Sequence, residues 1–376
     1  MAKGLFTQGM CVLLSTPIGV EQLRSTLRRF KFERELESEE DSQTLVYRFR
    51  PEAGGHLLVT LSPNPWPDDL GDPESSPDRF IAWSLGQYAP LAFPGCLRRA
   101  GEQSWSWDEG GEAVKTHQCH VRFLISYVLD SGGETDDADD NDGSEAITPP
   151  VNWNDIVSGM TDADDADDDG VDDDDDDDAL LPDDYDPIAE MDFMMRAVEA
   201  VMGLPESLCY FNPGGEVIRD RDGLREGLNF AWSHELPPLD MWTNVRIFKA
   251  DPAWSLMDTV GNGQFDVPDV EAVFDTGRYD PGDVERLLRS TTFYLVSGGG
   301  EIGDGDTVDG PGDQVWKAIE CVDGLSDPPR ETIRWVPQDD TSAPESLLDP
   351  GVDPESQFDE DDLDDDFDED AIDPMI

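Results

Sequence analysis

The sharpest concentration of chemically capable side chains is the tetrapeptide His117-Gln118-Cys119-His120. It holds two of the four histidines around a cysteine, and imidazole and thiolate are both good ligands for zinc or copper. In an extended strand, however, His117 and His120 point to opposite faces, and so do Cys119 and His120. Because no second Cys or His cluster completes a coordination sphere, we expect no metal here and predict structural or pocket-lining histidines.

A second candidate is an aspartate series that superficially has the ligand spacing of a calcium loop. Its candidate ligands are Asp165, Asp167, Asp169, Asp173 and Asp176. Asp172 stands where such loops carry an aliphatic residue, and Asp176 stands where they carry a bidentate Glu. In a run this rich in Asp the spacing arises by chance, and no amphipathic helices flank it. We predict only weak association with divalent cations.

The remaining residues form no known catalytic pattern. The sequence contains no Gly-x-Ser-x-Gly and no His-Glu-x-x-His, and its glycine-rich stretches lack the features of a phosphate loop. We therefore expect no cofactor and favour a protein without catalytic activity. The alternative is an enzyme of unrecognised type, with His117 or His120 as acid or base in a pocket rimmed by Asn212 and Trp242.

The acidity of the chain is concentrated in two segments. The 376 residues include 87 Asp and Glu against 25 Lys and Arg, which gives a formal net charge of −62. Residues 131–186 contain 24 of these acids and residues 338–376 contain 17, and neither segment contains Lys or Arg. Because such segments have too little apolar surface to offset the entropy of ordering, we predict a disordered acidic linker and tail.

Composition also limits the partners and the compartment. The negative charge repels phosphates and anionic lipids, which argues against a nucleic-acid groove and against membrane docking. We expect a basic protein surface as partner, with weak divalent-cation association at the linker. Five cysteines without a Cys-x-x-Cys indicate reduced thiols. No apolar run approaches the roughly 20 residues of a membrane span, and the N-terminal apolar run is too short for a signal peptide. The cytoplasm is therefore the expected compartment.

Outside the acidic segments, strand and helix patterns alternate. Strands are predicted at 9–15, 44–50, 56–62, 118–129, 207–211, 241–248, 267–274, 314–321 and 331–336. Apolar residues recur at helical spacing near 17–32, 187–202, 224–231 and 281–297. Hairpin pairs are frequent, so we predict an α+β fold with mixed or antiparallel sheets and packed helices. A β-α-β-β series at 9–62 has a second, weaker counterpart at 207–274.

The predicted organisation has four parts. An N-terminal α+β part covers residues 1–130, and the acidic linker or insertion covers 131–186. A C-terminal α+β part at 187–337 is expected to pack with the first, and the acidic tail covers 338–376.

Several ordered segments together resemble the bacterial domain-of-unknown-function family numbered 4261. The similar features are the helix 186–202 with Gly203-Leu204-Pro205, the strand 208–212 with Gly214-Gly215, Leu236-Pro237-Pro238 with Trp242, the strand 267–274 with Asp269 and Glu271, the helix 283–296, the turn 303–308, and His117-Gln118-Cys119-His120. The acidic insertion and tail are additions to that pattern. The resemblance implies a cytoplasmic α+β domain without an assigned activity or catalytic residues, and it suggests that His120 and Trp242 mark a shared surface or pocket.

Four functional hypotheses follow. We favour a non-catalytic protein-binding module of the immunity or adaptor kind, because catalytic constellations are lacking while aromatic residues and acidic arms suit a basic partner. The enzyme with a His117/His120 pocket is the second hypothesis. The third makes the acidic segments the function, as a calcium buffer or a mimic of nucleic-acid charge, and the fourth ascribes the acidity to a saline habitat.

Overall fold

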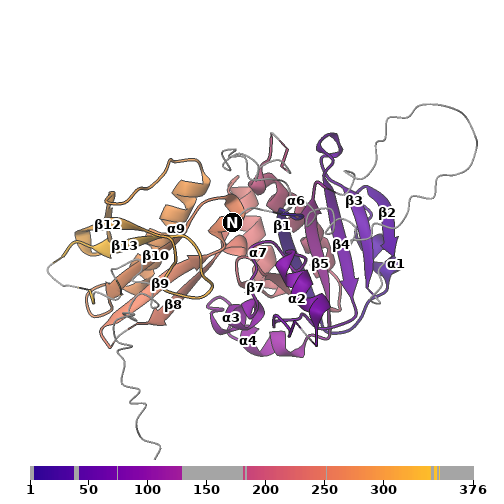
Figure 1. The fold of residues 1–376 in the computed structure, drawn as a ribbon, viewed down its shortest axis with the longest axis horizontal. Helices are drawn as coiled ribbons and strands as arrows, with labels where there is room; N and C mark the ends of the chain where they lie inside the picture. The colour runs from indigo at the N-terminus through magenta and orange to yellow at the C-terminus, as the bar shows by residue number, and fades with distance from the viewer. Residues whose placement is uncertain are drawn as a thin grey trace, which may run out of the picture.

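The computed structural model describes residues 4–37, 42–73, 75–128, 181–182, 184–250, 252–339, 343–344 and 347. Most of the predicted disordered linker and tail, and all five aspartates of the predicted cation site, lie outside these residues. Two sheets lie side by side in the described part, and α7 and β7 lie near the junction between them (Figure 1). The α+β fold with mixed and antiparallel sheets is confirmed.

The first sheet has seven antiparallel strands in the order β2-β3-β4-β5-β1-β6-β7. Their bounds are Gln8–Leu14 for β1, Phe32–Glu37 for β2, Gln43–Arg48 for β3, His56–Ser62 for β4, Cys119–Ser126 for β5, Ser207–Asn212 for β6 and Val217–Arg219 for β7. Apolar residues from Met10 to Leu14 lie on both faces of the interior strand β1, which is buried along its whole length. A strand with this pattern must be covered by helices on both sides.

Helices cover both faces of the first sheet. One face carries α1 (Val20–Thr26), α6 (Pro187–Met202) and α7 (Arg221–Ser233), and its core includes Met10, Val12 and Leu14 of β1. The opposite face carries α2 (Pro77–Ser84), α3 (Cys96–Glu102) and α4 (Gly110–Ala113), packed on Cys11 and Leu13. The short helix α8 (Leu239–Trp242) joins the first core.

The second sheet has six strands in the order β11-β12-β13-β10-β9-β8. Their bounds are Asn244–Lys249 for β8, Trp254–Val260 for β9, Asp269–Asp275 for β10, Thr307–Gly310 for β11, Gln314–Cys321 for β12 and Thr332–Pro337 for β13. Only β10 and β13 pair in parallel. Helix α9 (Pro281–Val296) packs on one face, and short 3-10 helices occur at Pro51–Ala53, Val114–Thr116, Asn262–Phe265 and Pro311–Asp313.

The sequence analysis missed four of the strands that the structure describes, β2, β7, β9 and β11. Residues Phe32–Glu37 form β2 directly after the first helix, so the N-terminal series is β-α-β-β-β. Residues Trp254–Val260 form β9, whereas Met241 and Trp242, predicted as the start of a strand, belong to α8. The second predicted β-α-β-β series is distributed over both sheets, because β6 belongs to the first sheet while β8 and β10 belong to the second.

The predicted parts of the chain are interleaved in the structure. Strand β6 pairs with β1, so residues from the 187–337 part complete the first sheet. At the other end, Asp339 accepts a hydrogen bond from Tyr279 Oη at 2.6 Å, and Ala343 is buried against the second sheet. The first residues of the predicted tail therefore pack on the fold.

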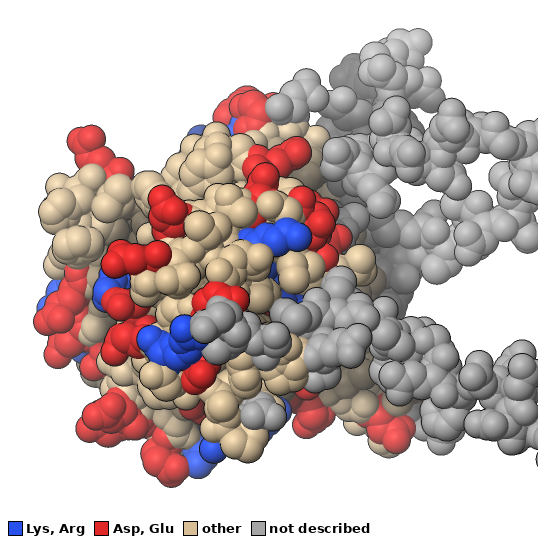
Figure 2. All heavy atoms as spheres, turned by 90° about the vertical axis from the view of Figure 1, so that its left-hand side faces the viewer, with Lys and Arg blue, Asp and Glu red and all other residues tan. Residues whose placement is uncertain are grey.

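The described surface reflects the composition of the chain. Figure 2 shows the face at the end of the second sheet, where Asp and Glu side chains are scattered among apolar and polar ones and Lys and Arg are fewer. None of the helices in the described part of the chain is long and apolar enough to cross a bilayer.

Candidate functional site

The two histidines of the predicted cluster are held by backbone groups. His117 Nε2 accepts a hydrogen bond from the Trp66 backbone N–H at 2.8 Å, and its Nδ1 contacts the Val114 carbonyl. His120 is 3% exposed, and its Nδ1 lies 3.0 Å from the Asn64 carbonyl oxygen. Burial, reinforced by the nearby Arg122 charge, lowers the pKa of His120 to about 3. The buried imidazole is therefore neutral at ordinary pH.

Asn212 and Trp242 form a second, separate pair. Asn212 Nδ2 donates to the Trp242 carbonyl oxygen at 2.9 Å, and its Oδ1 accepts from the Gly215 backbone N–H at 3.2 Å. A Cβ at Gly215 would lie 1.8 Å from the same Trp242 oxygen, so only glycine permits this close approach. Both Asn212 and Trp242 are fully buried. Their arrangement secures the turn after β6 against α8.

The sheet separates the two pairs. Cys119 packs in the core beneath α6, so alternation along β5 directs His120 to the opposite face, where it contacts the Trp66 ring at 5.4 Å between centroids. Asn212 follows Tyr210 on the α6 face, where Trp242 also packs. The four sequence candidates therefore do not line one pocket.

The described residues offer neither a cluster of metal ligands nor a reactive thiol. No group of three His, Cys, Asp or Glu side chains there is arranged to hold a metal ion. The cysteines Cys11, Cys96, Cys119, Cys209 and Cys321 are free and buried, and burial raises the pKa of each thiol. Thiols with raised pKa values are poor nucleophiles at neutral pH.

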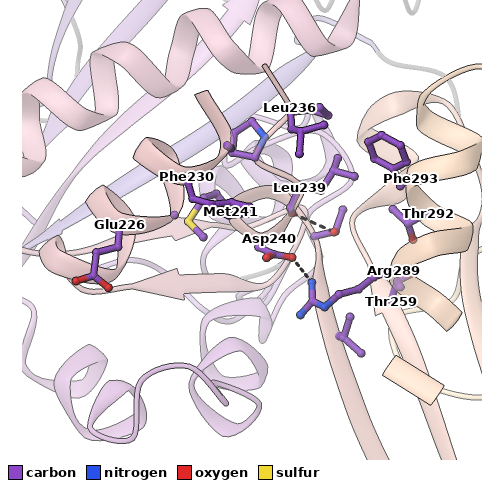
Figure 3. Close-up of a pocket in the computed structure, with 16 residues that line it drawn as sticks. Glu226, Phe230, Leu236, Leu239, Asp240, Met241, Thr259, Arg289, Thr292 and Phe293 are labelled. Carbon is purple, nitrogen blue, oxygen red and sulfur yellow. Dashed lines mark hydrogen bonds and ion pairs between the residues drawn. The ribbon is translucent and has the colours of Figure 1, made fainter. Parts of the chain in front are cut away.

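A different region offers a groove at the junction of the two sheets, which we call the apolar groove. Its volume is about 460 Å³. Its lining residues are Glu226, Gly227, Phe230, Ala231, Leu236, Pro237, Pro238, Leu239, Asp240, Met241, Thr243, Val245, Thr259, Arg289, Thr292 and Phe293. Figure 3 shows Phe230 and Leu236 on one wall and Phe293 on the facing wall formed by α9.

Local structure fixes both walls of the apolar groove. Helix α7 begins at the cap Asp220, whose Oδ1 accepts from the Gly223 N–H at 2.8 Å, and it packs Leu224 and Leu228 into the first core. Phe230 lies off this buried stripe and is 63% exposed. After α7, Leu236-Pro237-Pro238 lead into α8, and the prolines stiffen this wall.

Helix α9 forms the facing wall and, like α7, begins at a capping aspartate and buries one stripe of its side chains. The cap Asp280 accepts from the Gly282 N–H at 2.9 Å, and the buried stripe faces the second core. Phe293 lies off that stripe and is 42% exposed, while Leu236 across the groove is 40% exposed. Large apolar side chains thus remain accessible on both walls, although the helix stripes beside them are buried.

Apart from Glu226, the polar side chains of the apolar groove have hydrogen-bond or ion-pair partners. Arg289 pairs with Asp240 across the groove, as Figure 3 shows, and its Nε lies 2.8 Å from Glu285. Thr243 Oγ1 donates to the Leu239 carbonyl at 3.1 Å, and Thr259 Oγ1 donates to Asp269 at 2.8 Å. The groove therefore presents apolar contact area to a ligand and has few free hydrogen-bonding groups.

A second cavity, which we call the charged pocket, lies between α3 and the second sheet. Its volume is about 470 Å³. Its lining residues are Arg98, Arg99, Glu102, Gln103, Arg246, Phe248, Lys249, Ala250, Leu256, Leu325, Ser326, Asp327 and Leu347.

Beneath the charged pocket lies a buried ion-pair network. Arg246 is 1% exposed and forms two hydrogen bonds to Asp258, at 3.0 and 2.6 Å, and one to Glu216 at 3.0 Å. Arg99 reaches the same Glu216 at 2.6 Å. Burial raises the pKa of Glu216, although both arginines oppose the shift. For Asp258 the arginines outweigh the effect of burial, and the pKa is lowered.

The stretch from the end of β9 to β13, which includes α9, matches a known domain family. Residues 258–336 match the family model described as a domain of unknown function (DUF4261). The family resemblance is thus confirmed over these 79 of the 376 residues. The matched part contains Thr259, Arg289, Thr292 and Phe293 of the apolar groove, whereas the α7 and α8 wall lies outside it. Searches of curated proteins and of solved structures found no match.

Two acids named in the resemblance have structural partners in the matched part. Asp269 accepts from Asn262 N at 3.1 Å and from Arg330 Nε at 3.1 Å, and Glu271 pairs with Arg334. The sequence reasoning missed Phe230 and Phe293. A signal was present, because each is a large aromatic residue on a helix but outside its buried stripe.

Proposed function

We propose that this chain is a non-catalytic protein-binding module, of the immunity or adaptor kind, whose apolar groove receives an apolar segment of a basic partner. The observation that carries the proposal is the exposure of Phe230, Leu236 and Phe293 on the two walls of one groove. Clustered exposed apolar side chains around a cavity are typical of interaction sites. Aromatic residues in such positions dominate binding energy.

The apolar walls of the groove suit a helical or extended segment as its occupant. An amphipathic helix can lay its apolar stripe into a groove of this kind, with side chains at helical spacing as anchors. Covering an exposed Phe or Leu side chain contributes roughly 1.5–3 kcal/mol when burial is complete, so a few such contacts give useful affinity before the cost of association.

Charge supports a basic partner. Glu226 and Asp240 line the groove, and Arg289, the cation among the lining residues, is neutralised by Asp240 and Glu285. The formal charge of −62 attracts cationic proteins over a range set by ionic strength. Lysine or arginine residues flanking the apolar segment of the partner would meet this acidic surface.

The enzyme hypothesis has less support. None of the described residues that line the apolar groove is Ser, Cys, His or Lys, and its threonines are hydrogen-bonded. His117 and His120 are occupied by backbone groups and lie in neither cavity described above. We also infer a bacterial, cytoplasmic protein. The family resemblance supports the source, and the five free cysteines support a reducing compartment.

A defined peptide tests the groove. The probe is a synthetic amphipathic helix with leucines at helical spacing on one face and lysines elsewhere, titrated against the full chain by fluorescence anisotropy. We expect Phe230→Ser with Phe293→Ser to weaken binding by about tenfold or more, equivalent to about 1.4 kcal/mol. The matched control is Val322→Ser, which removes an apolar side chain that is 79% exposed elsewhere. Equal affinities for the parent and the groove variant would contradict the proposal.

A further inference from the structure

The charged pocket has the opposite chemistry to the apolar groove. Four cationic side chains line it, Arg98, Arg99, Arg246 and Lys249, against the two acids Glu102 and Asp327. The chain as a whole has more than three acids for every base. Among its lining residues alone, cations therefore outnumber acids, in contrast to the chain as a whole.

Two of the four cations are available to a ligand. Arg246 and Arg99 are committed to Asp258 and Glu216 in the buried network. Arg98 has a side chain that is 61% exposed, and its bond to Glu102 at 3.0 Å is a solvated pair of small strength. Lys249 is exposed and has no ion-pair partner among the described residues.

The floor of the charged pocket is apolar. Phe248, Leu256 and Leu325 line it, and they belong to a cluster that also contains Trp254 and Ala343. A ligand that uses the whole cavity must combine carboxylates for Arg98 and Lys249 with apolar side chains for this floor. Its chemical class is an acidic peptide with interspersed apolar residues.

The last described residues of the chain lie at the charged pocket, and the sequence that follows them has the composition of such a peptide. Ala343 is 9% exposed in the apolar cluster, and Leu347 both lines the pocket and accepts a hydrogen bond from Arg334 Nη1 at 3.4 Å. Leu347 is the last described residue. The following sequence from 348 to 363, LDPGVDPESQFDEDDL, contains seven acids and the apolar residues Leu348, Val352, Phe358 and Leu363.

We propose that the charged pocket binds residues 348–363 of the same chain. The segment starts at the pocket because it directly follows Leu347. Its first six residues alone span up to about 20 Å when extended, so the segment is long enough to cross the pocket. Tethering through Leu347 gives the segment an effective concentration on the order of millimolar, which favours it over a free acidic peptide. An acidic segment of another protein could enter only after this one leaves.

Cross-linking in the full chain tests the proposal, because the protein has only five lysines, Lys3, Lys31, Lys115, Lys249 and Lys317. A carbodiimide joins a lysine amine to a carboxylate with loss of water, and mass spectrometry locates the linked residues. We expect Lys249 to link to carboxylates of 348–363 about tenfold more often than Lys115 or Lys317 does, as tethering at the pocket requires. This yield should not change on dilution, because the link forms within one chain.

Matched variants separate the pocket from general charge. Arg98→Gln should lower the yield of Lys249 links to the segment several-fold, whereas Arg28→Gln, at an exposed position in the turn after α1, should leave it unchanged. Thermal unfolding confirms that both variants fold. Equal yields at all lysines would overturn the proposal, and so would links that disappear on dilution. The outcome is independent of the apolar groove, since no groove residue is altered or labelled.

Discussion

The apolar groove and the charged pocket have nearly the same volume, about 460 and 470 Å³, yet they have opposite chemistry. Strand β8 contributes to both. Val245 faces the groove, while Arg246 and Phe248 face the pocket. Strand β9 does the same with Thr259 and Leu256. Because successive side chains of a strand point to opposite faces, two adjacent strands separate a groove with apolar walls from a pocket lined by cationic side chains.

The two cavities also differ in what their residues contribute to stability. The groove displays Phe230 and Phe293, which protrude from helices whose buried stripes are complete without them. The charged pocket rests on Arg246, which joins Asp258 and Glu216 beneath it. The groove can therefore be altered without unfolding the protein, whereas the base of the pocket cannot.

The largest expected effect comes from the base of the charged pocket. Arg246→Met should lower the free energy of unfolding by about 3–5 kcal/mol, because it leaves Asp258 and Glu216 buried without this cation. Urea denaturation measures the loss. The control Arg98→Gln, at the exposed rim, should cost at most about 1 kcal/mol. Similar losses for the two variants would remove the distinction between the base and the rim.

The next largest expected effect concerns the buried imidazole of His120, which lies outside both cavities. The pKa of His120 is lowered to about 3 in the fold, so between that value and its ordinary pKa of roughly 6.5 the unfolded chain binds more protons. Above pH 6.5 His120 therefore does not lower the free energy of unfolding. Below pH 6.5 this free energy falls by about 1.4 kcal/mol per pH unit.

Unfolding measured from pH 7 to pH 5 checks this sign and size. His120→Gln should remove the His120 part of the slope, whatever its constant effect on stability. An unchanged slope in the variant would mean that acid sensitivity arises elsewhere, for example at the carboxylates beneath the charged pocket.

The smallest expected effect concerns the walls of the apolar groove. Phe230→Ser and Phe293→Ser should each change the free energy of unfolding by no more than about 0.5 kcal/mol, because both residues lie outside the buried helix stripes and remain 63% and 42% exposed. Chemical denaturation at neutral pH measures this difference. A loss of several kcal/mol would show that these residues support the core, and the groove would then differ less from the pocket than we infer.

Local patterns in the sequence predicted much of the fold. In α9, Val284, Leu288 and Leu295 recur at helical spacing behind the cap Asp280, and all are buried as expected. Strand β9 was missed because its Asp258 breaks the apolar pattern, and that aspartate is stabilised by Arg246 and Arg330 from other strands and loops. A partner so distant in sequence leaves no local signal.

The candidate site was harder to predict for the same reason. The walls of the groove come from α7, α8 and α9, and Phe230 and Phe293 are 63 residues apart in the chain. Likewise, Asp339 was assigned to the tail by composition, although Arg278 at 3.1 Å and Tyr279 hold its buried side chain. The histidine cluster was conspicuous in the sequence, but the ring nitrogens of its histidines contact backbone groups around them.

The central claim is that the apolar groove, on one side of β8 and β9, is the binding site for a basic apolar segment. Two full-length proteins test it by fluorine NMR, one carrying 4-fluorophenylalanine in place of Phe293 and the other in place of Phe248. Titration with the lysine- and leucine-bearing amphipathic peptide should shift the resonance at 293 and leave that at 248 unchanged. A shift at 248 without one at 293, or no shift at either, would contradict the account.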